Sequence, residues 1–292
     1  MSFKFILLSL ILLFVNQAEL KKVTINASTY LNKRCLLQAA KSLNYQEVAA
    51  LICGKKINDP QIKELFVVNG LIHIFVVSGA HLSFYKKLFR LIFPDWAAGF
   101  LTSSFLLLYT LTCSFTAPIF RAFIEQLNSN FNKLFKLNLN KYIIQLATAL
   151  ICIVVEPDYL KSVSLPMSWV AAMTMSMKDR PGKTLIVFLS LFPILLTFTE
   201  PNPLSAFTSF FISGFVSLFI LPLNLIIFLV PKLDFILSLF YDLFYILLDL
   251  IQPTSRTQET SSYSDLTTII CWVYALVMNI VIIFKSYRLK AL

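Results

Sequence analysis

A series of apolar runs separated by short polar stretches constrains this chain more than any other feature. Seven of the runs are candidate transmembrane helices: 96–115, 142–155, 163–177, 184–199, 204–230, 233–251 and 267–284. A crossing helix needs about 20 apolar residues, so the shorter runs have uncertain boundaries. Pro222 interrupts the longest run and predicts a kink or a broken helix.

Composition places these runs in a bilayer rather than in a soluble core. Hydrophobic residues make up 58% of the chain and charged residues 14%, with a mean hydropathy of +0.76. Soluble domains have about 45–50% and about 25%. We therefore expect an all-α, polytopic integral membrane protein with about seven transmembrane helices. A soluble enzyme, a disordered tail, a secreted disulfide scaffold and a large extramembrane domain are excluded.

The net charge of +10 comes from 25 Lys and Arg residues against 15 Asp and Glu residues. In a soluble protein this excess suggests a nucleic-acid partner, but cytoplasmic loops of membrane proteins also collect Lys and Arg. If the tail 285–292 is cytoplasmic, the loops 116–141, 178–183 and 231–232 lie on the same side of the membrane. The tail and these three loops hold eleven basic residues in all. The opposite loops hold five. This bias favours a cytoplasmic C-terminus.

The N-terminal part divides into an apolar start and a polar segment. Residues 1–18 suit a signal peptide or an N-terminal anchor, and cleavage after this stretch stays open. Residues 19–64 are expected to form a short extracytoplasmic helical segment that includes an amphipathic helix ending at Gly54. Cys35 and Cys53 share this segment and could form a disulfide in an oxidising compartment.

The next apolar stretch, 65–84, carries the chain's two histidines, His73 and His81. Both flanking stretches are expected outside, so this segment does not cross and forms a non-spanning or re-entrant amphipathic helix. The histidines would lie about 12 Å apart along a straight helix, too far for one metal ion. Ser78 and His81 could form a hydrogen-bonded pair, but no acid lies nearby to orient a nucleophile. A small-residue patch for helix packing explains Ser78 and Gly79 equally well.

Basic residues elsewhere have two interpretations. Lys86, Lys87 and Arg90 lie among aromatic residues, a pattern that suits a single DNA strand and lipid headgroups equally. Arg121 follows an apolar run, and position alone favours an orientation anchor.

Four motif blocks occur along the chain in a recognisable order. The first combines Ala49-Ala50-Leu51-Ile52-Cys53-Gly54 with Gly70-Leu71-Ile72-His73 and Ser78-Gly79-Ala80-His81. The others are Ala117-Pro118-Ile119-Phe120-Arg121-Ala122, Glu156-Pro157-Asp158-Tyr159-Leu160 with Met167-Ser168-Trp169, and Pro203-Leu204-Ser205-Ala206 with Leu221-Pro222-Leu223. Over residues 45–285 this order resembles the ComEC family of competence DNA-internalisation proteins. The stretch around Ser168 matches the family block poorly.

The resemblance implies a channel for single-stranded DNA across the bacterial cytoplasmic (inner) membrane during natural transformation. The competence membrane domain would span 65–284, with a cytoplasmic tail at 285–292. The residues expected to shape the strand's path, without catalysing bond chemistry or binding a metal or cofactor, are Gly70, His73, Ser78, Gly79, His81 and Arg121.

Many family members also carry an external oligonucleotide-fold domain and a nuclease domain, which have no counterpart in this sequence. The resemblance therefore implies a nuclease supplied by another protein, an extracytoplasmic DNA receptor and a cytosolic DNA-translocating motor as partners, beside membrane lipids. Two alternatives stay open: a small-solute transporter, and a non-conducting membrane scaffold.

Overall fold

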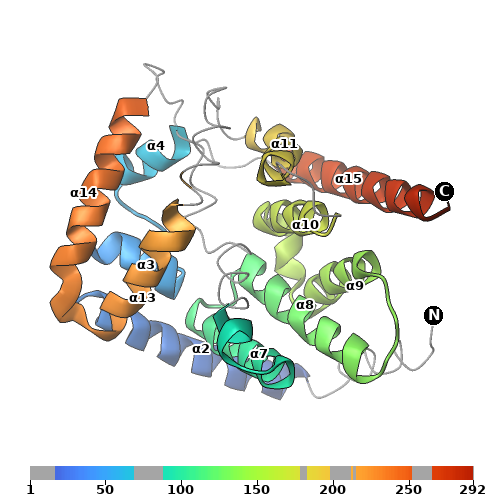
Figure 1. Ribbon diagram of the computed structural model, residues 1–292, viewed down its shortest axis with the longest axis horizontal. Coiled ribbons are helices and arrows are strands. Elements are labelled where there is room, and N and C mark those ends of the chain that lie inside the picture. Colours follow the sequence, from blue (N-terminus) through green and yellow to red (C-terminus); the bar gives the residue numbers. More distant parts are fainter. Residues whose placement is uncertain are drawn as a thin grey trace.

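The computed structural model describes residues 17–68, 88–177, 183–197, 212, 215–251 and 265–291, and all regular structure in these ranges is helical (Figure 1). This confirms the all-α prediction. The α-helices are α2 (Gln17–Ala39), α3 (Tyr45–Cys53), α4 (Pro60–Val68), α7 (Asp95–Thr112), α8 (Ala117–Leu134), α9 (Lys141–Val155), α10 (Ser164–Met175), α11 (Lys183–Leu195), α13 (Leu221–Leu229), α14 (Asp234–Ile251) and α15 (Asp265–Ala291). Short 3-10 helices η1 (Pro157–Lys161) and η3 (Pro231–Leu233) and a π-helix η2 (Val216–Ile220) complete them.

Six of the predicted apolar runs coincide with α7, α9, α10, α11, α14 and α15. Within the described residues, α15 alone contains a stretch long and apolar enough to cross a membrane, Asp265–Phe284, with a mean hydropathy of 2.3. Shorter apolar stretches lie at Ala97–Thr112, Lys141–Val155, Leu185–Leu195 and Leu218–Leu229. The number of membrane crossings therefore stays a prediction.

The run containing Pro222 shows the expected irregularity. The π-helix η2 leads directly into α13, and Pro222 lies in the first turn of α13. Proline has no N–H to donate to the preceding turn, and a wider turn relieves the clash of its ring with that turn. The first part of this run, 204–211, lies outside the described residues, as do residues 1–16 of the predicted signal or anchor at 1–18.

The stretch 116–141, which the sequence predicts to connect two membrane spans, is helical for most of its length, because α8 occupies Ala117–Leu134. Pro118 lies in the first turn of α8, where a missing N–H has no cost. Positive φ angles at Ser114 and Phe115 turn the chain from α7 into α8. The side chain of Asn140 then caps α9 by accepting a bond from the Tyr142 N–H. Tight turns of this kind make α7, α8 and α9 antiparallel neighbours.

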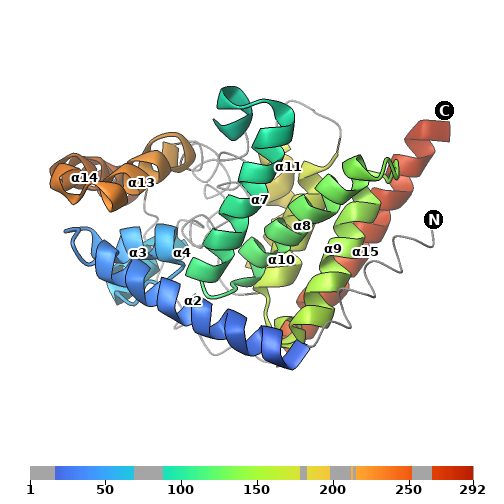
Figure 2. The ribbon, with the colours of Figure 1, turned by 90° about the horizontal axis from the view of Figure 1, so that it is seen from below.

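Of the four hydrophobic clusters among the described residues, the two largest organise the molecule, and Figures 1 and 2 show the helices that carry them. One joins α3, α13 and α14 with the end of α2 and Phe66 of α4. The other joins α9, α10, α11 and α15. In both views α14 and α15 lie at opposite ends of the molecule, with α2 and α7 between them. The structure thus places the predicted N-terminal segment 19–64, which contains α2, α3 and the start of α4, against α13 and α14.

Polar contacts fix this N-terminal segment to α13 and α14. The Gln38 side chain donates to the Phe228 carbonyl over 2.8 Å. The carboxylate of Asp234, at the start of α14, accepts from the Ser42 hydroxyl at 2.7 Å and from the Leu43 N–H. Since Asp234 is itself buried, these donors supply the partners that a buried carboxylate requires.

Candidate functional site

A buried arginine links three helices at the centre of the second motif block. Arg121 of α8 donates from Nε to the Ser168 hydroxyl of α10 at 2.8 Å. Its Nη1 donates to Glu125 Oε2 at 2.8 Å and to the Gln145 side-chain oxygen of α9 at 3.2 Å. The Arg121 side chain is only 4% exposed, and that of Glu125 is 35% exposed. Because a buried guanidinium needs a counter-charge and hydrogen-bond acceptors, this set of partners fixes Arg121 in place.

This contact joins two of the motif blocks that are distant in sequence. Arg121 belongs to the Ala117–Ala122 block, and Ser168 belongs to the block around Trp169. The poor match of the latter block to the family pattern therefore does not prevent its serine from contacting the arginine. Its position in the sequence favours a role for Arg121 in orienting the chain in the membrane. In the structure its side chain is buried and makes contacts inside the helix bundle.

Further side-chain amides continue this polar network along α8. Asn128 donates to the Thr148 hydroxyl of α9 at 3.0 Å, and both side chains are buried. On the other side, Asn130 donates to the Ser103 hydroxyl of α7 at 2.8 Å and also accepts a bond from Gln126. The polar side chains of α8 thus face α7, α9 and α10 rather than a loop surface. A helix that buries amides and a charge in an otherwise apolar bundle is typical of a functional element.

Of the three partners of Arg121, only Glu125 has a signal in the sequence. Arg121, Glu125, Asn128 and Asn132 recur at the spacing of one helical face, which indicates a helix with a polar face.

The block Glu156–Leu160 forms η1 and contacts the same region. The buried Tyr159 phenol donates to the Phe115 carbonyl in the turn before α8. Burial raises the pKa of Tyr159, so the phenol stays protonated and keeps this bond at any physiological pH. Trp272 of α15 donates to the Leu160 carbonyl at 2.9 Å. This turn is therefore anchored both to the turn that precedes α8 and to α15.

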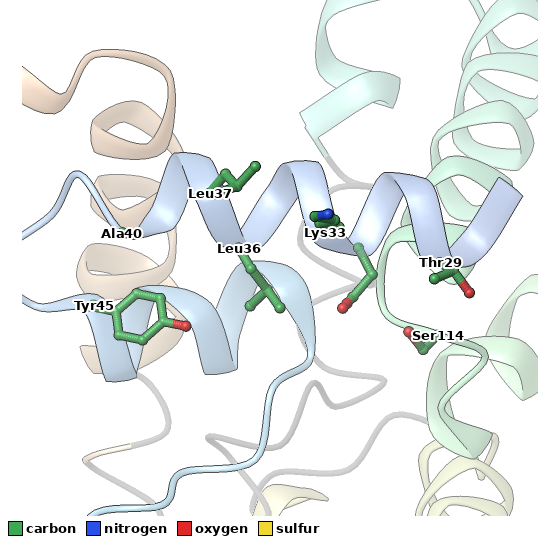
Figure 3. A pocket seen from close by; sticks show the side chains of 8 residues that line it. Thr29, Lys33, Leu36, Leu37, Ala40, Tyr45 and Ser114 are labelled. Atoms are coloured by element: carbon green, nitrogen blue, oxygen red, sulfur yellow. The ribbon is translucent and has the colours of Figure 1, made fainter. Parts of the chain in front are cut away.

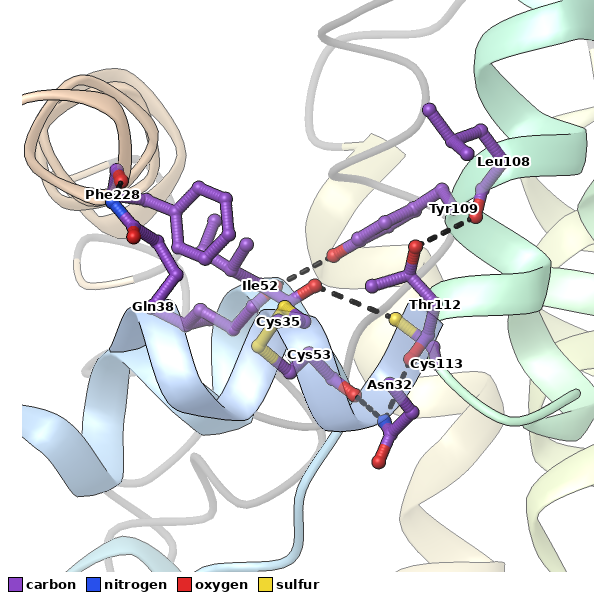
Figure 4. Close-up of a disulfide and its surroundings, with 11 residues drawn as sticks. Asn32, Cys35, Gln38, Ile52, Cys53, Leu108, Tyr109, Thr112, Cys113 and Phe228 are labelled. Carbon is purple, nitrogen blue, oxygen red and sulfur yellow. Dashed lines mark hydrogen bonds between the residues drawn. A yellow bond between two sulfur atoms is a disulfide. The ribbon is translucent and has the colours of Figure 1, made fainter. Parts of the chain in front are cut away.

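The first part of the first motif block, Ala49–Gly54, lies where α3 meets α7 (Figure 4). The last carbonyls of a helix lack partners within it. Here the Tyr109 phenol donates to the Leu51 carbonyl at 2.6 Å, and the Cys113 thiol lies 3.6 Å from the Ile52 carbonyl. Gly54 ends α3 as predicted, with a left-handed φ of 69°. A Cβ atom at Gly54 would lie 2.8 Å from the Cβ of Cys113, so the close approach also requires glycine.

A disulfide and an asparagine complete the junction between α2, α3 and α7. The structure contains a disulfide between Cys35 of α2 and Cys53 of α3, the pair that the sequence allowed. The Asn32 amide, one turn away on α2, donates to the Cys53 carbonyl at 3.0 Å and to the Thr112 carbonyl at 2.7 Å. Figure 4 shows the disulfide and these bonds side by side. The end of α3 is therefore held from both neighbouring helices.

A second buried carboxylate lies in α3. Glu47 is 5% exposed and accepts a hydrogen bond from the Tyr245 phenol of α14. Close by in the same cluster, Asn224 donates to the Ile220 carbonyl at 2.7 Å and to the Tyr241 phenol oxygen at 3.0 Å. The first of these bonds joins α3 to α14, and the bond between Asn224 and Tyr241 joins α13 to α14.

Most of the predicted site residues lie outside the described residues: Gly70, His73, Ser78, Gly79, His81, Lys86 and Lys87. Arg90 is described and lies exposed in a helical turn at 88–92. The roles of the first five residues in the DNA path, and the contacts of Lys86, Lys87 and Arg90 with DNA or lipid, stay predictions. Among the described residues, no group of three or more His, Cys, Asp or Glu side chains could hold a metal ion.

Comparison with known proteins gives one match. A family model described as "Competence protein" matches residues 51–290, well over half of the 292 residues. No curated protein and no solved structure matches the chain. The matched range contains the Arg121 network, the end of α3 and the buried asparagine and tyrosines of α13 and α14, and it confirms the resemblance found in the motif blocks. The chain therefore belongs to the competence protein family, a membrane-associated family whose membership implies a role in DNA uptake during transformation.

Proposed function

We propose that this protein is the membrane core through which one strand of DNA crosses the bacterial cytoplasmic membrane. The observation that carries the proposal is the family match over residues 51–290. In this role the chain conducts the strand without making or breaking covalent bonds. An extracytoplasmic receptor delivers the DNA, a cytosolic motor pulls it, and a separate nuclease degrades the other strand.

The exposed apolar surface supports a multi-pass position in the membrane. Large apolar side chains face outward along α14 and α15, at opposite ends of the molecule: Phe235, Leu239, Ile246, Ile269, Val273, Val277, Ile280 and Phe284. Exposed apolar patches of this extent are unusual for a soluble protein. Lipid on both sides of the molecule would cover these side chains.

The polar helix α8 supports a hydrophilic interior. In a bilayer, Arg121 and the buried amides of α8 are tolerated only where protein or a water-filled path surrounds them. We propose that α8 crosses the membrane with α7 and α9 and that its Arg121 network holds α9 and α10 at the border of the DNA path. The segment that carries His73, Ser78 and His81 forms the other border. Arg121 then acts through the helices that it positions.

Transformation of a deletion strain tests this proposal. The strain is complemented with the wild-type chain, with Arg121→Ala, with Arg121→Lys or with the control Lys136→Ala, whose lysine is exposed at the end of α8. We expect transformation to be lost in the deletion and strongly reduced in both Arg121 variants, because Lys cannot reproduce the guanidinium's bonds to three partners. Immunoblots of the membrane fraction verify equal protein levels. Normal transformation of the deletion strain would refute the proposal and favour a solute transporter. If cells with either Arg121 variant transformed normally at wild-type protein levels, the role proposed for the Arg121 network would be wrong.

A further inference from the structure

The outer surface of α2, α3 and their connecting turn carries positive charge without compensating negative charge. Residues 22–56 contain six basic residues: Lys22, Lys33, Arg34, Lys41, Lys55 and Lys56. Five of them are exposed, and Lys55 is partly exposed. The one acidic residue in the range, Glu47, is buried against Tyr245. We call these six side chains, with Tyr30 and Tyr45, the N-terminal basic surface. Most of it precedes residue 51, where the family match begins.

Two of the cations lie over aromatic rings. The Arg34 guanidinium is 5.4 Å from the centre of the Tyr30 ring, and its Nε donates to the Tyr30 phenol oxygen at 3.1 Å. The Lys55 ammonium is 4.6 Å from the centre of the Tyr45 ring and donates to its phenol oxygen at 2.8 Å. Tyr30 is 58% exposed, and a single cation covers one ring face only. Rings next to cations are what single-stranded nucleic acid recognises, since bases stack on rings while phosphates pair with cations.

The same surface is hollowed beside Tyr45 (Figure 3). A pocket of about 380 Å³ lies between α2, the start of α3 and the turn after α7. Its lining consists of Thr29, Asn32, Lys33, Leu36, Leu37, Ala40, Tyr45 and Ser114. The volume falls within the range of small-ligand sites, about 300–1,000 Å³. With an apolar floor, hydroxyl groups and Lys33 beside it, the pocket has the chemistry for one base and its phosphate.

The distribution of residues on α2 disfavours a membrane surface as the partner. A helix that lies on a membrane separates an apolar face from a charged face. On α2 the exposed Val23, Tyr30 and Leu37 lie between Lys33 and Arg34 on one helical face, so no apolar face is available for lipid.

We propose that the N-terminal basic surface binds single-stranded DNA, with the disulfide between Cys35 and Cys53 holding α2 and α3 together. The inference rests on the proposed function, since it assigns a docking site to the strand that the membrane core conducts. It adds a contact site in a part of the chain that the family match does not cover.

Oligonucleotide binding by the purified full-length protein in nanodiscs of neutral lipid tests this inference. Anisotropy of a fluorescein-labelled oligothymidylate gives the affinity at several salt concentrations. The test variant is Lys33→Ala/Arg34→Ala, and the matched control is Lys133→Ala/Lys136→Ala, which removes two exposed lysines from the end of α8. Each phosphate contact with a single strand contributes about 0.7 to the slope of log affinity against log salt, so we expect the test variant to lose about 1.4. The control should keep the wild-type slope.

A second variant tests stacking separately from charge. Tyr30→Ala removes an exposed ring that lies outside both hydrophobic clusters, so the fold should persist. We expect it to weaken binding at least about fivefold with little change in slope, the lower limit for one stacked base. Wild-type slope and affinity in both variants would overturn the inference. So would a charge effect that occurs only in nanodiscs of phosphatidylglycerol, which would identify anionic lipid as the partner.

The transformation assay separates this inference from the proposed function. If the deletion strain fails to transform but Lys33→Ala/Arg34→Ala transforms and binds DNA normally, the docking site is wrong and the channel remains. If the deletion strain transforms normally, the proposed function is wrong, and the salt slope still decides whether the surface binds DNA.

Discussion

Substitution of Gly54 tests whether α3 and α7 meet as closely as the structure shows. An alanine at this position must adopt a left-handed φ of 69°, which costs about 1–2 kcal/mol for an L-residue. Its Cβ would also lie 2.8 Å from the Cβ of Cys113, where carbon atoms normally stay about 3.5–4.0 Å apart. Relieving such an overlap costs about 1–3 kcal/mol. We therefore expect Gly54→Ala to lower the free energy of unfolding by about 2–5 kcal/mol.

A second glycine provides the matched control. Gly99 lies inside α7, and a Cβ there would meet only the Asn130 side-chain oxygen at an ordinary 3.6 Å. Alanine is favoured over glycine in a helix by about 0.5–1 kcal/mol, so Gly99→Ala should be neutral or stabilising. Urea unfolding in detergent micelles, followed by circular dichroism, measures both variants. In a Cys113→Gly background, Gly54→Ala should cost less, because its clash with the Cys113 Cβ and Sγ is gone. The 3.2 Å approach to the Cys113 Cα and the backbone strain should remain. Equal stability of the two alanine variants would refute the close contact.

Three further predictions use the same unfolding assay. Replacing Cys35 and Cys53 by serine removes a disulfide with a sequence separation of 18 and should lower the free energy of unfolding by about 3 kcal/mol. A loss below about 1 kcal/mol would argue against the disulfide. Tyr245→Phe leaves the buried Glu47 without its phenol donor and should cost about 1–3 kcal/mol, whereas wild-type stability would show that water replaces the phenol. Asp234→Ala removes the acceptor for the turn between α2 and α3 and should cost about 1–3 kcal/mol, with faster proteolysis in that turn; unchanged proteolysis would contradict the docking.

The helices that the sequence predicted are those whose composition differs most from that of a soluble protein. Apolar runs located α7, α9, α14 and α15, and Gly54 located the end of α3. Local signals are sufficient to predict such elements, because few structures other than a helix can accommodate a long apolar run. The irregular turn near Pro222 also followed from local chemistry, since proline lacks the N–H that a regular helix needs.

The sequence did not predict where polar residues are buried. Residues 117–134 are rich in Asn and charged residues, and only the partners of these side chains on α7, α9 and α10 make this stretch a buried helix. Ser168 and Gln145 gave no signal of their own, since their importance depends on Arg121 lying within hydrogen-bond distance in the fold. The pairing of Glu47 with Tyr245 likewise depends on α3 packing against α14.

The location of labelled DNA in cells tests the central claim most directly. Competent cells of the wild type and of the deletion strain take up radiolabelled DNA, and the label that resists external nuclease is then divided between the space outside the inner membrane and the cytoplasm. If the protein conducts the strand, the deletion strain should accumulate protected DNA outside the inner membrane with none in the cytoplasm, and the wild-type gene should restore cytoplasmic single strands. Cytoplasmic single strands at wild-type levels in the deletion strain would contradict the account.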